Sequence, residues 1–205
     1  MAPCVNDNFT VMLFKLSRII LATLFLLNIP VTAFAHDVGG TGFFSGLEHP
    51  VIGPDHLLAM LSVGLLSAQI GGRAVWTVPA TFVSVMLVGG IIGILKIPVP
   101  FVEYGIVASV VVLGIAIALD KKVPIEASMA FVGFFAIFHG HAHGTEIPNF
   151  AQPFYYALGF IAGTACIHLT GVLIGYVSML SKPSSYFLRF LGIVIAIRGV
   201  QLYAG

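Results

Sequence analysis

Six long apolar stretches, separated by short breaks, make up the chain after residue 36. Each break carries glycine, proline or charged residues, which interrupt apolar helices and favour turns. A helix needs about 20 mainly apolar residues to cross the hydrocarbon core of a bilayer. The pattern therefore predicts an all-α, polytopic membrane protein with six transmembrane helices. The predicted spans are residues 55–70, 74–95, 101–119, 124–143, 154–180 and 184–203.

The first predicted span differs from the others because it is short and follows two proline-containing breaks. Starting at Asp55 it would be about 24 Å long, less than the hydrocarbon thickness of about 30 Å. Pro50 is expected to force His49 out of helical dihedrals, and Pro54 suits the first turn of a new helix. We therefore predict a first span broken at its outer end, preceded by a short helix near residues 41–48. Broken helices in membranes often mark transport sites.

A separate apolar segment precedes these spans and is typical of a cleavable signal peptide. Residues 12–35 combine a basic start, an apolar core and a small-residue ending of the A-x-A type. We therefore assign residues 1–35 to a signal peptide, with Met12 as an alternative start, and residues 36–205 to a single six-span domain. Cleavage would make His36 the first mature residue. An uncleaved additional span is the alternative interpretation.

The distribution of basic residues among the predicted loops indicates an orientation. The first, third and fifth loops hold most of the loop lysines and arginines, whereas the second and fourth hold only Lys96. By the positive-inside rule, the odd-numbered loops face the cytoplasm. We therefore expect a multi-pass protein of the inner (cell) membrane, with mature N- and C-termini both outside the cytoplasm.

Composition narrows the class of protein further. Of the 205 residues, 59% are hydrophobic and only 8% are charged, and the formal net charge is +1. The bilayer is therefore the expected partner, and nucleic acid is not. The sequence has no GxxxxGK[ST] motif, which argues against direct use of ATP. Cys4 and Cys166 are far apart and provide neither a CxxC metal site nor a disulfide framework.

Five of the seven histidines lie in two short polar clusters. The first cluster, residues 49–56, precedes and opens the first span, and the second, residues 138–148, ends the fourth. In the predicted orientation, both clusters lie at the outer face of the membrane, so their side chains should meet. Ionisable groups at membrane depth are candidates for a functional site. The candidate metal ligands are His49, Asp55, His56, His139, His143 and Glu146, with His36 and His168 as further candidates.

Helical phase separates the members of the second cluster. At about 100° per residue, His143 lies about 40° from His139, and Glu146 lies about 20° to the other side. His141 lies about 160° from His139 and should point elsewhere. Imidazole and carboxylate ligands together suit Ni²⁺, Co²⁺, Zn²⁺, Cu²⁺ or Fe²⁺ better than Cu⁺ or Ca²⁺. The clusters therefore predict a site for a divalent transition metal.

Both clusters resemble motifs of the HupE/UreJ family of nickel permeases. The family motif HPxxGxDH stands complete at residues 49–56, and FHGxAHGxExP stands complete at residues 138–148. In the second motif, the family leaves the position between the two histidines unspecified. Here that position is His141, the residue that helical phase also separates from His139 and His143. The resemblance implies uptake of Ni²⁺ that supplies a hydrogenase or urease. A related branch of the family is associated with cobalt, so Co²⁺ is an alternative cargo.

These observations favour a permease, not an enzyme, that moves Ni²⁺ into the cytoplasm and holds no permanent cofactor. Facilitated diffusion is the expected mechanism, because no Asp or Glu lies in the middle of a predicted span to relay protons. A membrane metalloenzyme, with Glu146 or Asp55 as general base at a His-bound metal, is the alternative from another class. A metal sensor or accessory subunit is a third interpretation. A homo-oligomer is an alternative to a monomer.

Overall fold

The structure, a computed structural model, describes residues 42–121, 123–146, 152–180 and 182–204. In these ranges the regular structure is α-helical and contains no strand, as the apolar pattern predicted. The helices are α2 (Gly42–Ile52), α3 (Pro54–Ile70), α4 (Ala74–Ile94), α5 (Val102–Leu119), α6 (Ile125–Thr145), α7 (Pro153–Ser178) and α8 (Lys182–Ala204).

The predictions that concern the start of the chain fall outside the described residues. They include the signal peptide at residues 1–35, the alternative start at Met12, and the terminal ligand His36. These remain predictions. The isolated Cys166 is described, and it lies in α7 as a free, exposed cysteine.

The predicted membrane spans correspond to helices of suitable length. Each of α4, α5, α6, α7 and α8 contains a segment that is long and apolar enough to cross a membrane. The bent pair α2 and α3 adds a sixth span when its two helices are counted together. The two helices of this pair meet at an angle of 84°. The chain is therefore a polytopic, all-α membrane protein with a broken first span.

The break in the first span lies at Gly53. This residue has an extended backbone, with φ −83° and ψ 114°, as expected for the residue before Pro54. The prediction that Pro50 also breaks the chain is wrong, because His49 and Pro50 both lie inside α2, which continues to Ile52. Pro50 is buried in the last turn of α2. Prolines are tolerated in membrane helices where neighbouring helices compensate for the lost hydrogen bond.

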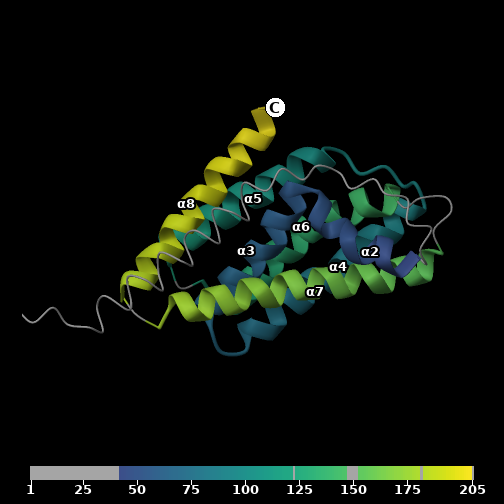
Figure 1. Ribbon diagram of the computed structural model, residues 1–205. Helices are drawn as coiled ribbons and strands as arrows, with labels where there is room; N and C mark the ends of the chain where they lie inside the picture. The colour runs from purple at the N-terminus through teal and green to yellow at the C-terminus, as the bar shows by residue number, and fades with distance from the viewer. Residues whose placement is uncertain (1–41, 122, 147–151, 181, 205) are drawn as a thin grey trace, which may run out of the picture. The chain divides into compact units, whose positions relative to one another are not determined.

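Small residues allow the helices to approach closely, and α7 is the support for the broken span. In Figure 1, α2 and α7 lie side by side, and these two helices form one of the most extensive contacts in the structure. A Cβ atom added at Gly46 would collide with the backbone of Tyr156, and one added at Gly64 would collide with the carbonyl of His168. Close packing through glycine is a common way to associate membrane helices. Consequently α2 follows the first half of α7, and α3 follows the second half.

Helix α3 occupies the centre of the described structure. It contacts each of the other described helices, and almost every residue from Leu58 to Ala68 is buried. A helix that is apolar all around is expected in such a central place. Helix α6 packs mainly along α4, where Gly140 lies against the backbone of Met86. This arrangement brings the beginning of α3 next to the end of α6, where the two polar clusters lie.

Candidate metal site

The first turn of α3 holds an aspartate and a histidine in a fixed mutual geometry. Oδ1 of Asp55 accepts a hydrogen bond from the backbone N–H of His56 at 2.9 Å. The same oxygen is 2.9 Å from Nδ1 of the His56 ring. Because an ionised carboxylate only accepts hydrogen bonds, Nδ1 must carry the proton and donate it. The lone pair is then on Nε2, which is buried and has no hydrogen-bond partner among the described residues.

A serine of α5 holds the His139 ring of α6 in a comparable way. The hydroxyl of Ser109 donates to the carbonyl of Ile106 at 2.6 Å and lies 2.9 Å from Nε2 of His139. Since the hydroxyl proton is already used, Ser109 accepts a hydrogen bond from Nε2–H. The lone pair of His139 is then on Nδ1, which is buried without a described partner. Metal-binding histidines typically donate their second ring N–H to such an outer partner.

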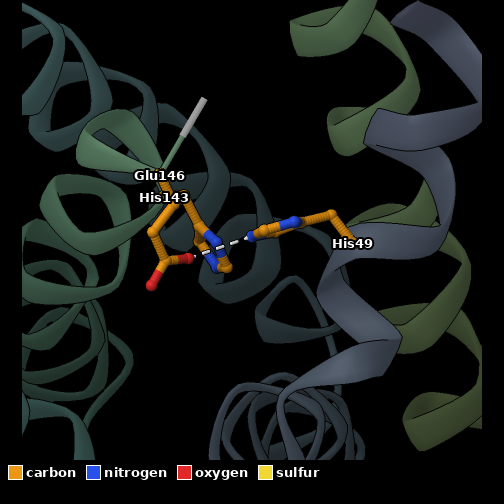
Figure 2. A group of neighbouring side chains, drawn as sticks. All are labelled: His49, His143 and Glu146. Atoms are coloured by element: carbon orange, nitrogen blue, oxygen red, sulfur yellow. Dashed lines mark hydrogen bonds and ion pairs between the residues drawn. The ribbon is translucent and has the colours of Figure 1, made fainter. Parts of the chain in front are cut away.

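Three side chains from two helices come close enough to share one ion. His49 of α2 and His143 and Glu146 at the end of α6 each offer a ligand atom, and these atoms lie within 4.8 Å of one another. Figure 2 shows His49 reaching across from α2 to His143 of α6 and to Glu146 directly after this helix, with its Nε2 3.2 Å from Oε2 of Glu146. Neither ring nitrogen of His143 has a hydrogen-bond partner among the described residues. The hydrogen bond from His49 lowers the pKa of Glu146, which keeps this carboxylate charged.

The histidine rings of the two clusters form one continuous group. The ring of His56 is 4.2 Å from that of His143 and 4.9 Å from that of His139, measured between ring centroids. His49 is 4.9 Å from His143. We call His49, Asp55, His56, His139, His143 and Glu146 the histidine cluster. The structure thus brings together all six residues that the two sequence motifs nominated.

Exposure decreases steadily through the histidine cluster. The side chain of Glu146 is 55% exposed and that of His49 is 23% exposed. His143 is 5% exposed, and His139 is fully buried. Free nitrogen lone pairs therefore extend from the surface into the interior. Buried polar atoms without partners are rare in native structures, and a role in binding a ligand is one explanation for them.

The two remaining described histidines lie apart from the histidine cluster. Nε2 of His141 is 2.9 Å from the carbonyl oxygen of Ile97, so this ring points toward the segment that follows α4, as helical phase predicted. His168 lies deeper, in the second half of α7, and its closest aromatic neighbour is Phe82 at 5.3 Å. The structure therefore does not bring His168 into the cluster.

Sequence reasoning missed three residues that shape the site. Ser109 is the only hydroxyl residue among apolar neighbours from Gly105 to Leu119, and this isolation was the available signal. Tyr156 and Phe160 of α7 form an aromatic wall, with the Phe160 ring 4.4 Å from His143 and the Tyr156 ring 5.7 Å from His49. No pattern in the sequence distinguishes these two aromatic residues from others that face lipid.

Comparisons with known proteins agree with the two motifs. The HupE / UreJ protein family model matches residues 24–202. The chain is 40% identical over 188 residues to "Protein HupE" of Rhizobium leguminosarum bv. viciae, a match that covers 91% of this chain and 97% of that protein. No solved structure matches the chain.

Proposed function

The chain belongs to the HupE/UreJ family, and from this premise we propose that it carries Ni²⁺ through the cell membrane into the cytoplasm. Members of this family are membrane transporters of metals such as nickel or cobalt, so the chain is a metal transporter and not an enzyme. This removes the metalloenzyme interpretation. The single observation that carries the nickel proposal is the group of nitrogen and oxygen ligand atoms of His49, His143 and Glu146 within 4.8 Å.

We assign different tasks to the members of the histidine cluster. His49, His143 and Glu146 take the ion first, because Glu146 and His49 are the most exposed members of the cluster and all three residues lie within reach of one ion. His56 and His139 receive it next through Nε2 and Nδ1, which have no other described partner. Asp55 and Ser109 act as outer partners that fix these two rings. Each such partner typically changes metal affinity by about 10–100-fold.

The donor set supports a borderline divalent metal. It consists of imidazole nitrogens and carboxylate oxygens, which suit Ni²⁺ and Co²⁺. Cys166, the cysteine among the described residues, is exposed on α7 and does not belong to the cluster. Ni²⁺ is the proposed cargo and Co²⁺ the alternative within the same family. Supply of a hydrogenase or urease is the use that the family resemblance implies.

Orientation and driving force complete the proposal. The positive-inside distribution puts the histidine cluster and both mature termini outside the cytoplasm. The membrane potential then favours entry of a divalent cation by about 4.6 kcal/mol per 100 mV. In the described helices α3 to α8, acidic residues occur only in first turns, at Asp55, Glu103 and Glu126. We therefore propose facilitated diffusion driven by this potential.

The test is uptake of radioactive nickel by proteoliposomes that contain the purified full chain. An inside-negative potassium diffusion potential should accelerate uptake, and unlabelled Ni²⁺ should compete more strongly than Co²⁺ or Zn²⁺. Empty liposomes and the His141→Ala variant serve as controls, because His141 lies outside the cluster. Uptake no faster than in empty liposomes would refute transport. Stronger competition by Co²⁺ would replace nickel with cobalt as cargo.

A further inference from the structure

Four residues of α7 at four-residue intervals begin beside the histidine cluster and continue deeper into the molecule. They are Tyr156, Phe160, Thr164 and His168, and each is buried. Residues four apart are neighbours on a helix surface, so these side chains form a row that winds slowly around α7. At about 1.5 Å per residue, the row extends about 18 Å along α7. Its first two members contact His49 and His143, and its last two lie deeper in the molecule.

The last two members of the row are polar and unsatisfied. His168 is 2% exposed, and neither of its ring nitrogens has a hydrogen-bond partner among the described residues. The hydroxyl of Thr164, one turn earlier, is fully buried and also has no described partner. A histidine that serves only for packing would normally be hydrogen-bonded, because an unsatisfied buried polar group costs about 1–3 kcal/mol. We call Thr164 and His168 the inner pair.

A phenylalanine of α4 lies next to both the histidine cluster and the inner pair. The ring of Phe82 is fully buried, 5.5 Å from the His139 ring and 5.3 Å from the His168 ring. His139 is the most buried member of the histidine cluster. Phe82 therefore contacts the most buried histidine of the cluster and also the histidine of the inner pair.

His168 also borders a cavity that the histidine cluster does not reach. This cavity of about 330 Å³ is lined by residues of α4 and α7, among them Trp76, Pro79, Ser84 and His168, and it opens to the outside of the bundle, where Trp76 is 67% exposed. Trp76 and Pro79 belong to the first turns of α4. The opposite end of α4 is the one that packs near the histidine cluster, where Gly93 lies against the backbone of His141. His168 thus stands between the cluster and a cavity toward the other end of the bundle.

We propose that the inner pair is a second, internal binding station for the transported divalent metal, and that the Phe82 ring is the barrier before it. The proposal rests on the transport function proposed above. An imidazole nitrogen of His168 and the hydroxyl oxygen of Thr164 would ligate the ion, with water completing the coordination. Such a site is weak compared with the histidine cluster. Weak internal binding suits conduction, because the ion must be able to leave.

A thiol placed at position 168 reports directly whether the metal arrives there. In a full chain with Cys4→Ser and Cys166→Ser, His168→Cys introduces the only thiol. Addition of Ni²⁺ alone should produce a sulfur-to-nickel charge-transfer band in the near ultraviolet. The matched control is Leu173→Cys in the same background, because Leu173 is also on α7 but is 64% exposed. It should show no band. A His168→Cys protein that still binds Ni²⁺ at the histidine cluster but shows no band would overturn the proposal.

Transport measurements give a second, independent readout. His168→Ala should bind Ni²⁺ at the histidine cluster with unchanged affinity, while its initial uptake rate falls by about tenfold, which corresponds to about 1.4 kcal/mol at the barrier. Normal uptake by His168→Ala would exclude the inner pair as a station and leave the proposed function intact. Absence of uptake by the unmodified chain would instead refute the proposed function.

Discussion

Two rings of the histidine cluster, those of His56 and His139, are held in a way that the ring of His168 is not. In the cluster, Asp55 fixes one nitrogen of His56 and Ser109 fixes one nitrogen of His139. His168, like His143 of the cluster, has no hydrogen bond to either nitrogen within the described part of the chain. A ring held at one nitrogen presents the other lone pair in a constant direction, as a selective site requires. An unheld ring can turn and release its ligand. We therefore propose that the held rings of His56 and His139 retain the ion during capture, whereas the unheld ring of His168 serves its passage.

The largest effect should come from removing a fixed ring together with its partner. The double variant Asp55→Ala, His56→Ala eliminates the ligand nitrogen that lies between His143 and His139. We expect nickel uptake to fall by about 100-fold, the upper end of the range for metal-site mutations. The inner pair remains in this variant, so the loss would show that the inner pair cannot capture the ion unaided.

The measurement is initial uptake of radioactive nickel at equal amounts of inserted protein, with insertion checked by limited proteolysis. The control is the double variant Thr77→Ala, Thr81→Ala on α4, whose hydroxyls bond only to carbonyls one turn earlier. Near-normal uptake by the Asp55, His56 double variant would show that the fixed ring is not needed for capture.

A smaller effect is expected when only an outer partner is removed. Ser109→Ala leaves every proposed ligand in place but releases the His139 ring. The apparent affinity for Ni²⁺ should weaken by about tenfold, whereas the maximal uptake rate should change little. Ser109→Thr retains the hydroxyl and should restore the affinity. The matched control is Ser128→Ala, a buried serine on α6 whose hydroxyl bonds to the carbonyl of Pro124.

The outcome of the serine substitutions discriminates positioning from packing. If Ser109 only fills space, Ser109→Ala and Ser128→Ala would lower protein stability alike and leave the nickel affinity unchanged. That result would contradict the tautomer assignment for His139 and remove the contrast between held and unheld rings.

A still smaller effect on transport is expected at His141. Its ring bonds to the carbonyl of Ile97 and not to the cluster. His141→Ala should therefore retain most nickel uptake and lower stability by about 1 kcal/mol, the usual net contribution of one hydrogen bond. Thermal unfolding in detergent measures the second quantity. A loss of uptake as deep as in His139→Ala would place His141 in the transport machinery.

The smallest effect concerns the mature N-terminus. If cleavage follows residue 35, the α-amine and the imidazole of His36 can chelate one metal ion. Insertion of a single alanine before His36 should then weaken the apparent nickel affinity and leave maximal uptake unchanged. Mass spectrometry of the purified N-terminus checks the premise. Any first residue other than His36 would remove this group from the account.

The convergence of the two motifs could be predicted because it follows from counting spans. If the first span begins at one membrane face, the fourth span ends at that same face. The polar ends of these two spans therefore share one face of the membrane. Helical phase likewise predicted that His141 points away from His139 and His143. These inferences needed only spacing and alternation, both of which are visible in one sequence.

Other features depend on packing that a single sequence does not display. Pro50 lies inside α2 because α7 supports that helix, an effect of tertiary contact that outweighs local preference. Ser109 becomes a partner of His139 only because α5 packs against α6. Phe82 lies near both His139 and His168 because α4 contacts both α6 and α7. The sequence therefore nominated the candidate ligands, including Asp55, but not Ser109 or Phe82.

The most direct test of the account is X-ray absorption at the nickel edge of the full-length protein loaded with one equivalent of Ni²⁺. We predict a first shell of nitrogen and oxygen, with the outer-shell scattering that is typical of several imidazoles and with no sulfur. The imidazole contribution should decrease in His143→Ala, which lacks one of the proposed first ligands, and stay unchanged in His141→Ala. A spectrum that matches hydrated nickel, or one identical in all three proteins, would contradict the claim that the histidine cluster binds the metal.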